Sequence, residues 1–248
     1  MLARIDRVLA AFGRDRPRMT PAEVARETGL PPATAHRMCA DLAAAGWLAR
    51  SPGGTYAVGT RLWELATRAA PETTLAAAAA PFLQDVQSAL QQHVQLGRLE
   101  GDEVLFLQRV SHPGSRPISS AVAERLPLHR SATGLVLLAH EPADERAAWI
   151  RRALQRGETL PQGGPRDLER VLAEIRATGH AIQTGNLEPD RTGIAVPVMT
   201  RPGQVIAGLG IVADRTLAPV DPGAVVQALH TAAHGIARVV EQAAHPIE

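Results

Sequence analysis

The stretch from residue 20 to residue 58 restricts the fold of this chain most strongly, because it carries the signals of two short helices and a hairpin in close succession. Thr20 can cap a helix that begins at Pro21, and Glu23 can complete a capping box by reaching back to the cap. Gly29 then turns the chain into a second helix. Two short helices joined by a tight turn that contains glycine are typical of a helix-turn-helix motif.

A further helix and a small hairpin flank this motif. Apolar residues recur at helical spacing across residues 2–12, and Gly13 follows where such a helix would end. Residues 47–50 and 55–58 predict two short strands around a glycine-rich tip. We therefore expect residues 1–59 to form a winged helix-turn-helix domain that is mainly α with a small β wing.

The second helix of the motif opens at Pro32 and has an apolar face opposite a face of small residues around one arginine. Such a face can enter the major groove of DNA, where alanine can touch thymine methyl groups and arginine can bond guanine or phosphate. The wing has another arginine at its base, where it can meet a backbone phosphate. The residues predicted to contact DNA are Ala33, Thr34, His36, Arg37 and Arg50. A three-helix unit with a hairpin is also compatible with a protein-interaction module.

Charge is distributed unevenly along the chain, although the formal net charge is only +1. Residues 1–70 hold ten arginines against six acidic residues, a net charge of +4, while the remainder holds sixteen arginines against nineteen acidic residues, a net charge of −3. A basic N-terminal part suits binding of nucleic acid.

The single cysteine, Cys39, excludes an internal disulfide, and no signal peptide or membrane-spanning run is recognisable, so we expect a cytoplasmic protein.

The rest of the chain alternates strand and helix signals. Hydrophobicity takes a period of two within residues 94–107 and again within 194–212, and a turn inside each stretch predicts a hairpin. Helical periodicity marks residues 60–70, 74–91, 165–178 and 222–240. Thr60 can cap the first of these helices and Pro71 ends it, while Pro81 is expected to kink or interrupt the second. Antiparallel hairpins separated by helices indicate an α+β domain.

The loop from residue 126 to residue 134 is the most informative part of this domain. Ser131 can cap the helix that follows, and Ala132, Thr133 and Gly134 offer free backbone N–H groups at its start. Free N–H groups and the helix dipole attract anions, so the carboxylate of a small ligand could bind there. A plain capped helix without a ligand explains the same residues, and from these residues alone it is the commoner situation.

The run AEVARETGLPPATAHRMCADLAAAGWLARSPGGTYAVG resembles the DNA-binding domain of IclR-type transcriptional regulators in its residue types and in their spacing. Residues 126–134 and 179–198 resemble the effector-binding domain of the same family. The resemblance implies a winged helix-turn-helix in residues 1–59 and a linker helix in 60–72 that helps to pair subunits. It also implies an α+β, GAF-like effector-binding domain with an antiparallel sheet in residues 73–248.

The resemblance further implies a set of residues around the effector. Backbone groups at the start of the helix after Ser131 would contact the ligand, and Arg191 is a candidate counter-charge. The predicted effector-binding residues are Ala132, Thr133, Gly134, Gln183, Arg191, Thr192, Gly193 and Gly210. The chain departs from the family's usual pattern at Gln183 and Asn186, where acidic residues are common, and at Pro32 and Ala33, where members often carry a polar residue.

By this resemblance we expect a DNA-binding regulator of a catabolic operon, a repressor that is controlled by a small organic carboxylate. It would bind double-stranded DNA at an inverted repeat as a homodimer or as a homotetramer built from two dimers, with no cofactor, metal or membrane involved. The alternative is a hydrolase or isomerase of a small molecule that uses its N-terminal part for dimerisation. No G-x-S-x-G elbow, phosphate-binding loop or metal-ligand spacing supports catalysis. Sequence-specific DNA binding would favour the regulator, and turnover of a small acid would favour the enzyme.

Overall fold

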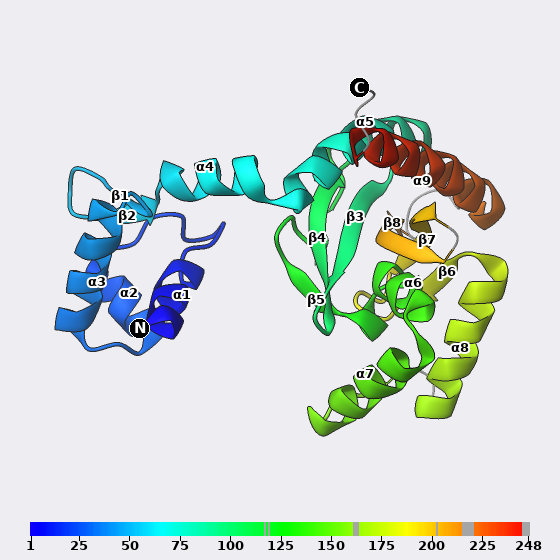
Figure 1. The fold of residues 1–248 in the computed structure, drawn as a ribbon, viewed down its shortest axis with the longest axis horizontal. Coiled ribbons are helices and arrows are strands. Elements are labelled where there is room, and N and C mark those ends of the chain that lie inside the picture. The colour runs from blue at the N-terminus through cyan, green and yellow to red at the C-terminus, as the bar shows by residue number, and fades with distance from the viewer. Residues whose placement is uncertain (117, 119, 161–163, 202, 215–220, 245–248) are drawn as a thin grey trace. The chain divides into compact units, whose positions relative to one another are not determined.

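The computed structural model describes residues 1–116, 118, 120–160, 164–201, 203–214 and 221–244. Contacts divide the chain into two compact units, an N-terminal unit of Met1–Thr73 and a C-terminal unit of Thr74–Glu248 (Figure 1).

The N-terminal unit holds the predicted helix-turn-helix and wing. Its elements are α1 (Leu2–Ala10), α2 (Pro21–Thr28), α3 (Pro32–Ala44), β1 (Leu48–Arg50), β2 (Tyr56–Val58) and α4 (Thr60–Ala69). The capping box of α2 is formed, since the Glu23 N–H donates to Thr20 Oγ1 at 3.3 Å and the Thr20 N–H donates to Glu23 Oε2 at 2.7 Å. Gly29 ends α2 in the left-handed region with φ of 67°, which is the turn that glycine permits at low cost.

A hydrophobic core of its own stabilises the N-terminal unit. Val8, Val24, Ala35 and Cys39 are all fully buried in it, so the three helices share one core. The wing joins this core through Tyr56, which pairs with Met19 in an isolated antiparallel bridge. The expectation that α3 turns its apolar face inward is confirmed.

The helix α4 differs from its prediction in its first residue. Gly59 occupies the cap position without a side-chain bond, and Thr60 is the first helical residue, so the predicted Thr60 cap is wrong. No residue of α4 is buried. Trp63 and Leu65 leave 68% and 39% of their surface exposed, so this helix has large apolar side chains that the described residues leave uncovered.

The C-terminal unit is built on an antiparallel sheet. Its strands are β3 (His93–Glu100), β4 (Glu103–Val110), β5 (Arg125–Pro127), β6 (Ala181–Thr184), β7 (Arg191–Arg201) and β8 (Gln204–Asp214). Within the described residues they pair in the order β5-β4-β3-β8-β7-β6. Both predicted hairpins are present, as β3 with β4 and as β7 with β8. The predicted α+β class with an antiparallel sheet is confirmed.

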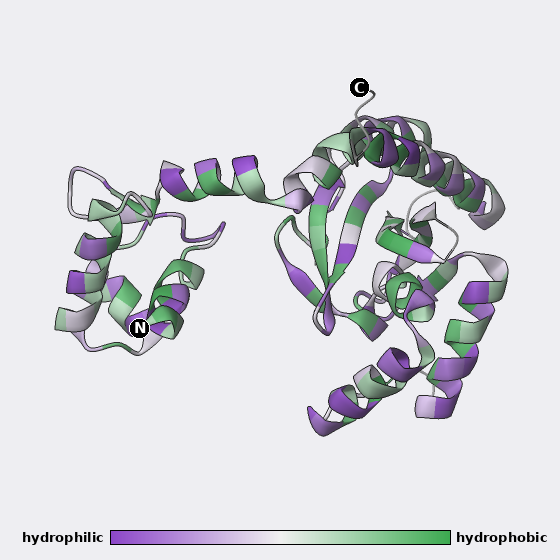
Figure 2. Ribbon diagram, in the orientation of Figure 1, coloured by the Kyte–Doolittle hydropathy of each residue, from purple (hydrophilic) through white to green (hydrophobic). Residues whose placement is uncertain are grey.

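Helices cover both faces of this sheet (Figure 1). They are α5 (Pro71–Leu90), α6 (Ala132–His140), α7 (Ala143–Gln155), α8 (Pro165–Thr178) and α9 (Pro222–Ala244), with a short 3₁₀ turn η1 (Leu128–Arg130) before α6. Polar and apolar residues alternate along α7, α8 and α9, as amphipathic helices require (Figure 2). Pro71 begins α5 rather than only ending α4. Pro81 lies inside α5 without interrupting it, because a single proline removes only one bond of the helical ladder.

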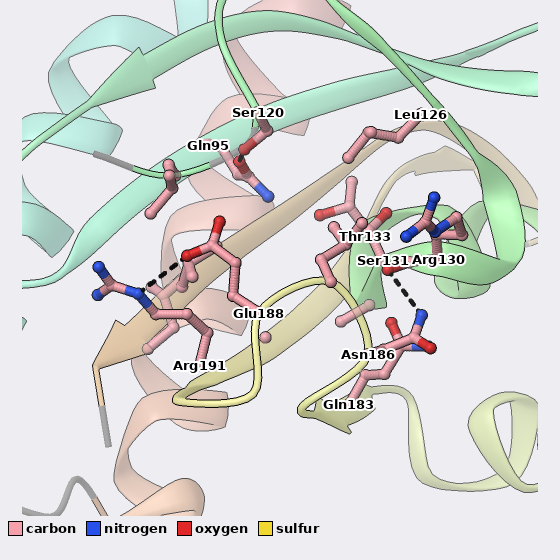
Figure 3. Close-up of a pocket in the computed structure, with 16 residues that line it drawn as sticks. Gln95, Ser120, Leu126, Arg130, Ser131, Thr133, Gln183, Asn186, Glu188 and Arg191 are labelled. Atoms are coloured by element: carbon pink, nitrogen blue, oxygen red, sulfur yellow. Dashed lines mark hydrogen bonds and ion pairs between the residues drawn. The ribbon is translucent and has the colours of Figure 1, made fainter. Parts of the chain in front are cut away.

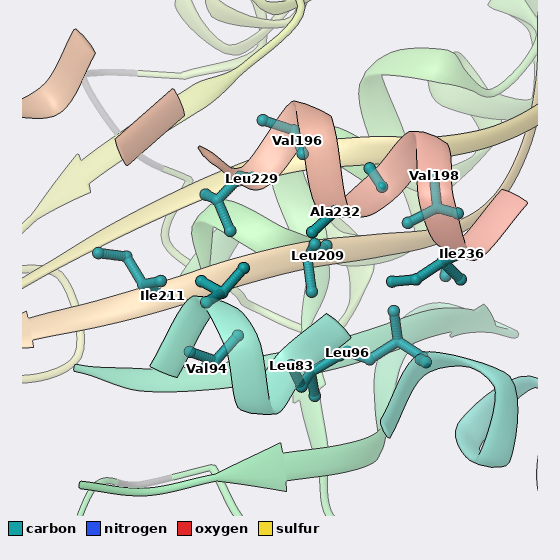
Figure 4. Packing of buried hydrophobic residues seen from close by; sticks show 14 of the residues in the cluster. Leu83, Val94, Leu96, Val196, Val198, Leu209, Ile211, Leu229, Ala232 and Ile236 are labelled. Carbon is teal, nitrogen blue, oxygen red and sulfur yellow. The ribbon is translucent and has the colours of Figure 1, made fainter. Parts of the chain in front are cut away.

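The alternation of the strands separates two cores. Val94, Leu96, Leu209 and Ile211 point to the face that α5 and α9 cover, where they pack on Leu229 and other apolar residues of α9 (Figure 4). The second core lies on the opposite face, between the sheet and α6, α7 and α8. At full burial each such aliphatic side chain contributes roughly 1.5–3 kcal/mol. The sheet is therefore a rigid support for the start of α6.

Candidate DNA-binding surface and ligand pocket

The residues predicted to contact DNA lie on the outer side of the N-terminal unit. Ala33, His36 and Arg37 are exposed on α3, and Thr34 is half-buried. The cap position of α3 is Pro31, which has no side-chain bond to offer, but Pro32 has no N–H group and the Thr34 N–H donates to the Pro31 carbonyl at 2.9 Å, so the first turn of α3 has few N–H groups left for a phosphate. Arg37 also lines a groove between α1 and α3, together with Met1, Arg4, Ile5, Thr34, Met38, Asp41 and Leu42.

The wing presents Arg50 to solvent. Leu48 of β1 is buried, whereas Ala49 and Arg50 are exposed. A second arginine, which the sequence interpretation missed, lies beside it: the Arg18 guanidinium donates to Ser51 Oγ at 3.4 Å. Arg18 lies next to the wing because its neighbour Met19 forms a bridge to Tyr56 of β2. Met19 is therefore the residue whose pairing would have drawn attention to Arg18.

The two arginines on α3 and the wing should have separable effects on DNA binding. We expect Arg37→Ala to lower discrimination between operator and unrelated duplexes, because a bidentate arginine contact to a base is worth roughly 1–3 kcal/mol. Arg50→Ala should weaken all duplexes alike and lower the slope of log affinity against log salt by about one. Titrations of both variants across salt concentrations check this. If Arg50→Ala alters sequence preference while Arg37→Ala does not, the two roles are reversed.

A pocket opens in the C-terminal unit at the start of α6 (Figure 3). Its cavity volume is about 50 Å³, within a wider hollow of about 490 Å³ that includes open solvent. Its walls come from the end of η1 and the first turn of α6, from β5 and residues before it, from β3 and β8, and from β6, β7 and the segment between them. The lining residues are Gln95, Ile118, Ser120, Leu126, Arg130, Ser131, Ala132, Thr133, Gln183, Asn186, Leu187, Glu188, Arg191, Gly193, Ile211 and Val212.

Glycines in the sheet determine how closely α6 approaches. A Cβ atom at Gly208 would lie 2.9 Å from Thr133 Cγ2, and one at Gly210 would lie 3.0 Å from Thr133 Oγ1. Thr133 is 1% exposed and fills the space that these glycines and Gly97 leave. The first turn of α6 therefore rests directly on the sheet backbone, and the Thr133 side chain belongs to that packing.

Five of the eight residues that were predicted to surround a ligand line this pocket, and their contact with a ligand stays a prediction. They are Ala132, Thr133, Gln183, Arg191 and Gly193. Gly210 is instead a packing residue for Thr133. Thr192 turns its hydroxyl to Thr184 Oγ1 on the neighbouring strand, at 3.1 Å. Neither is among the lining residues.

Gly134 also lies outside the pocket lining. Its N–H donates to Ser131 Oγ at 3.0 Å, so the predicted cap exists and occupies one of the three N–H groups that were expected to be free. A Cβ atom at Gly134 would lie 2.2 Å from the Leu128 carbonyl oxygen, which makes glycine a packing requirement here. The backbone N–H groups of Ala132 and Thr133 remain for a ligand.

Arg191 lines the pocket, but its charge is compensated within the protein. The guanidinium lies 2.9 Å from Asp214 Oδ2 and 3.3 Å from Glu188 Oε2, and both Arg191 and Asp214 are at least 94% buried. Arg191 also donates to the Arg116 carbonyl at 3.3 Å. Arg191 therefore reaches the pocket with its charge already paired, and its role as a counter-charge stays a prediction. Arg191 thus links Asp214, the last residue of β8, to Glu188 in the pocket lining.

Two side-chain amides tie β6 and the segment after it to the turn before α6. Gln183 Nε2 donates to the His129 carbonyl at 2.9 Å. Asn186 Nδ2 donates to the Arg130 carbonyl at 3.0 Å (Figure 3). The Gln183 Oε1 atom is buried and accepts no hydrogen bond from the described residues. The sequence interpretation singled out both positions as departures from the family's usual acidic residues, and it did not predict these partners.

His93 fixes the segment of residues 111–116 through two hydrogen bonds. It is 3% exposed, and its ring nitrogens lie 3.0 Å from Ser111 Oγ and 2.9 Å from the Arg116 carbonyl. Burial lowers the pKa of His93 below its usual 6.5, and the nearby charges of Arg191 and Arg109 lower it further. His93 is therefore neutral at pH 7 in the folded protein.

We expect acid to destabilise the C-terminal unit through His93. Below pH 6.5 the unfolded chain binds a proton at His93 that the folded chain does not, so the free energy of unfolding falls as pH falls towards the folded pKa. Urea unfolding between pH 7.5 and pH 5 measures this slope. His93→Gln should reduce the slope, and replacing the exposed His36 by Gln is the control. An unchanged slope in His93→Gln would contradict this role of His93.

The described residues contain no group of three or more His, Cys, Asp or Glu side chains that could hold a metal ion. Among the same residues, no helix combines the length and apolar character needed to cross a bilayer.

Comparison with known proteins identifies the family of both units. The IclR helix-turn-helix domain matches residues 2–52, and the C-terminal domain of the bacterial transcriptional regulator IclR matches residues 67–238. The Pca regulon regulatory protein of Pseudomonas putida is 30% identical over 213 residues, covering 85% of this chain and 72% of that protein. The transcriptional regulator KdgR of Escherichia coli is 26% identical over 210 residues, covering 82% and 78%.

A solved structure is similar over almost the whole chain. It is the crystal structure of an IclR homolog from Microbacterium hydrocarbonoxydans complexed with 4-hydroxybenzoate, with 37% identity and a TM-score of 0.85. The match covers 97% of this chain and 98% of that one. The two domain matches together span most of the sequence, and the relatives named above regulate transcription. The chain therefore belongs to the IclR family and is a DNA-binding transcriptional regulator.

Proposed function

We propose that this regulator changes its affinity for operator DNA when a small organic acid fills the pocket at the start of α6. An aromatic acid of the size of 4-hydroxybenzoate is the first candidate, because the similar Microbacterium protein was crystallised with that compound. The likeness to the Pca regulon regulatory protein supports control of a catabolic operon. A repressor that acts in the cytoplasm is the simplest form of this proposal.

The observation that carries the proposal is the pocket itself. It joins apolar lining from Ile118, Leu126 and Leu187 to the N–H groups of Ala132 and Thr133, for which the described residues supply no acceptor. An apolar cavity with a few convergent polar groups is the usual form of a small-molecule site. Since Asp214 and Glu188 compensate Arg191, preference for an acid depends on the start of α6 and on the exposed Arg130 at the pocket. The helix contribution is roughly 0.3–2 kcal/mol.

We further propose that two chains pair to read an inverted repeat, as a dimer or as two dimers. The exposed apolar side chains of Trp63 and Leu65 on α4 support pairing, because a helix without a buried residue has its apolar side chains available to a partner. A helix-turn-helix dimer binds half-sites about one helical turn or a multiple of a turn apart.

Calorimetry with the full chain tests the ligand class. We expect 4-hydroxybenzoate to bind more tightly than its neutral analogue 4-hydroxybenzamide by about 2-fold to 30-fold, which is the range of the helix contribution. Thr133→Asp is a poor probe of the anion site, because Thr133 is buried against the sheet and a buried carboxylate would disturb the fold. Equal or tighter binding of the neutral compound would contradict an acid site. Turnover of the acid without sequence-specific DNA binding would favour the enzyme alternative.

A further inference from the structure

We propose that Gln95 selects an acid that carries a neutral hydrogen-bond acceptor, a carbonyl or hydroxyl oxygen, at the end away from its carboxylate. The inference rests on the proposed function, because it assigns a chemical preference to the same pocket. It is carried by the side-chain amide of Gln95, a residue that lines the pocket and is 4% exposed. Gln95 lies outside the set of effector-binding residues that the family resemblance implies.

The alternation of β3 points Gln95 into the pocket. Its neighbours Val94 and Leu96 pack into the core under α5 and α9, so the side chain of Gln95 lies on the opposite face of the strand. There the Ser120 hydroxyl donates to Gln95 Oε1 at 2.5 Å. Ser120 is itself buried, and its carbonyl oxygen accepts from the Arg109 guanidinium at 2.5 Å. The oxygen of the Gln95 amide is therefore held by a fixed partner.

The NH₂ group of this amide is available to a ligand. Because Ser120 bonds the oxygen, the amide turns its nitrogen Nε2 toward the pocket (Figure 3). None of the described residues accepts a hydrogen bond from Nε2. Nε2 is also not among the fully buried polar atoms that lack a partner, so it keeps surface that a ligand atom can reach. A few donors placed in this way are what orients a ligand in a mostly apolar site.

Gln95 lies apart from the N–H groups at the start of α6. A Cβ atom at Gly193 of β7 would lie 3.8 Å from the Ala132 nitrogen, so this N–H group is beside β7. Gln95 is on β3, and β8 lies between β3 and β7. At a strand spacing of about 4.8 Å, β3 and β7 are roughly 10 Å apart. An effector whose carboxylate binds at α6 can therefore place a second polar group beside Gln95.

The chemistry of an amide favours a neutral acceptor at this second position. Arg191 is already paired with Glu188 and Asp214, so a second carboxylate would be buried against a neutral donor without a cation of its own. Burying a charge in that way costs more than burying a carbonyl or hydroxyl oxygen that accepts from Nε2. An apolar group in the same place would cover Nε2 without accepting its hydrogen bond, which is also costly.

The test compares 3- and 4-formylbenzoate with the methylbenzoates substituted at the same positions, by calorimetry on the full chain. The two substituents are similar in size, but only the formyl oxygen accepts a hydrogen bond. We expect one formyl isomer to bind the unaltered protein at least about 5-fold more tightly than its methyl counterpart, the fold-change for about 1 kcal/mol. Gln95→Met keeps the length of the side chain and removes the NH₂ group, so the ratio should fall to within about 2-fold of one.

Gln92→Met is the matched control. Gln92 is also buried and accepts from the Asp214 N–H at 3.4 Å, but it does not line the pocket, so the preference for the formyl group should persist. Thermal melting establishes that both variants fold, and the comparison on the unaltered protein decides the question if Gln95→Met does not. The inference is overturned if neither formyl isomer binds more tightly than its methyl counterpart, or if Gln95→Met retains the full ratio. If none of the acids binds, the proposed function fails and this inference fails with it, which is a different result from binding without discrimination.

Discussion

Gly134→Ala is expected to lower the free energy of unfolding of the C-terminal unit by about 3 kcal/mol, the upper part of the range for overpacking. The added Cβ atom would lie 2.2 Å from the Leu128 carbonyl oxygen and 2.7 Å from the Leu128 Cα atom. Both are backbone atoms of η1, so no side chain can rotate to make room. The turn must move, and with it the cap of α6 and one wall of the pocket. A shift of about 2–4 °C per kcal/mol for a unit of this size predicts a melting temperature roughly 6–12 °C lower.

Gly223→Ala is the matched control, because Gly223 also lies in the first turn of a helix, α9. A Cβ atom there would meet Asp221 Oδ1 at 3.5 Å, an ordinary contact. Alanine is the better helix former by up to about 1 kcal/mol, so this variant should melt at the same temperature or slightly higher. Equal melting temperatures for Gly134→Ala and the unaltered chain would mean that the close approach of η1 and α6 is not a packing requirement.

The full chain is expected to bind an inverted-repeat operator at least about 100-fold more tightly than residues 1–73 alone. The N-terminal unit has its own hydrophobic core, so it should fold and bind duplex DNA weakly through one reading helix. When two such units are paired, binding of one half-site holds the other unit near the second half-site, so the second binding step becomes intramolecular. Gel-shift titrations with the whole repeat and with a single half-site measure the gain, which should vanish on the half-site.

Trp63→Glu separates pairing from folding, because Trp63 is 68% exposed and its loss removes no buried contact of α4. We expect this variant to sediment as a smaller species and to lose most of the advantage on the inverted repeat. Arg61→Ala on the same exposed helix is the control, since it breaks only a surface ion pair with Glu64, worth about 0.5 kcal/mol. A Trp63→Glu protein that stays paired and binds the repeat normally would exclude α4 as the pairing element.

Most of the fold could be predicted because its signals are local. Thr20 with Glu23, Gly29 and the hairpin turns each specify a conformation within a few residues, and the period of hydrophobicity gives the buried face. Pro71 was misread because proline both follows helices and begins them, and only the tertiary structure decides which.

The site was harder to predict because its contacts are distant in sequence. Gly134 lies in the first turn of α6, and Gly193 and Gly210 lie on the strands beneath it, but only the assembled sheet decides which of them lines the pocket and which permits packing. The pairing of Arg191 with Asp214 was within reach, since extending the register of the β7–β8 hairpin places these residues opposite each other. The bond from Gln183 to the His129 carbonyl had no comparable signal, because it joins residues 54 positions apart.

The central claim is that ligand in the pocket and DNA on α3 are coupled, and one titration tests it most directly. Fluorescence anisotropy of the intergenic duplex beside the protein's own gene is followed with increasing protein, without and with saturating 4-hydroxybenzoate. We predict that the acid changes the apparent Kd by about 5-fold to 150-fold, and that operator DNA changes the affinity for the acid by the same factor. Superimposable DNA titrations, under conditions where calorimetry finds the acid bound, would contradict the claim.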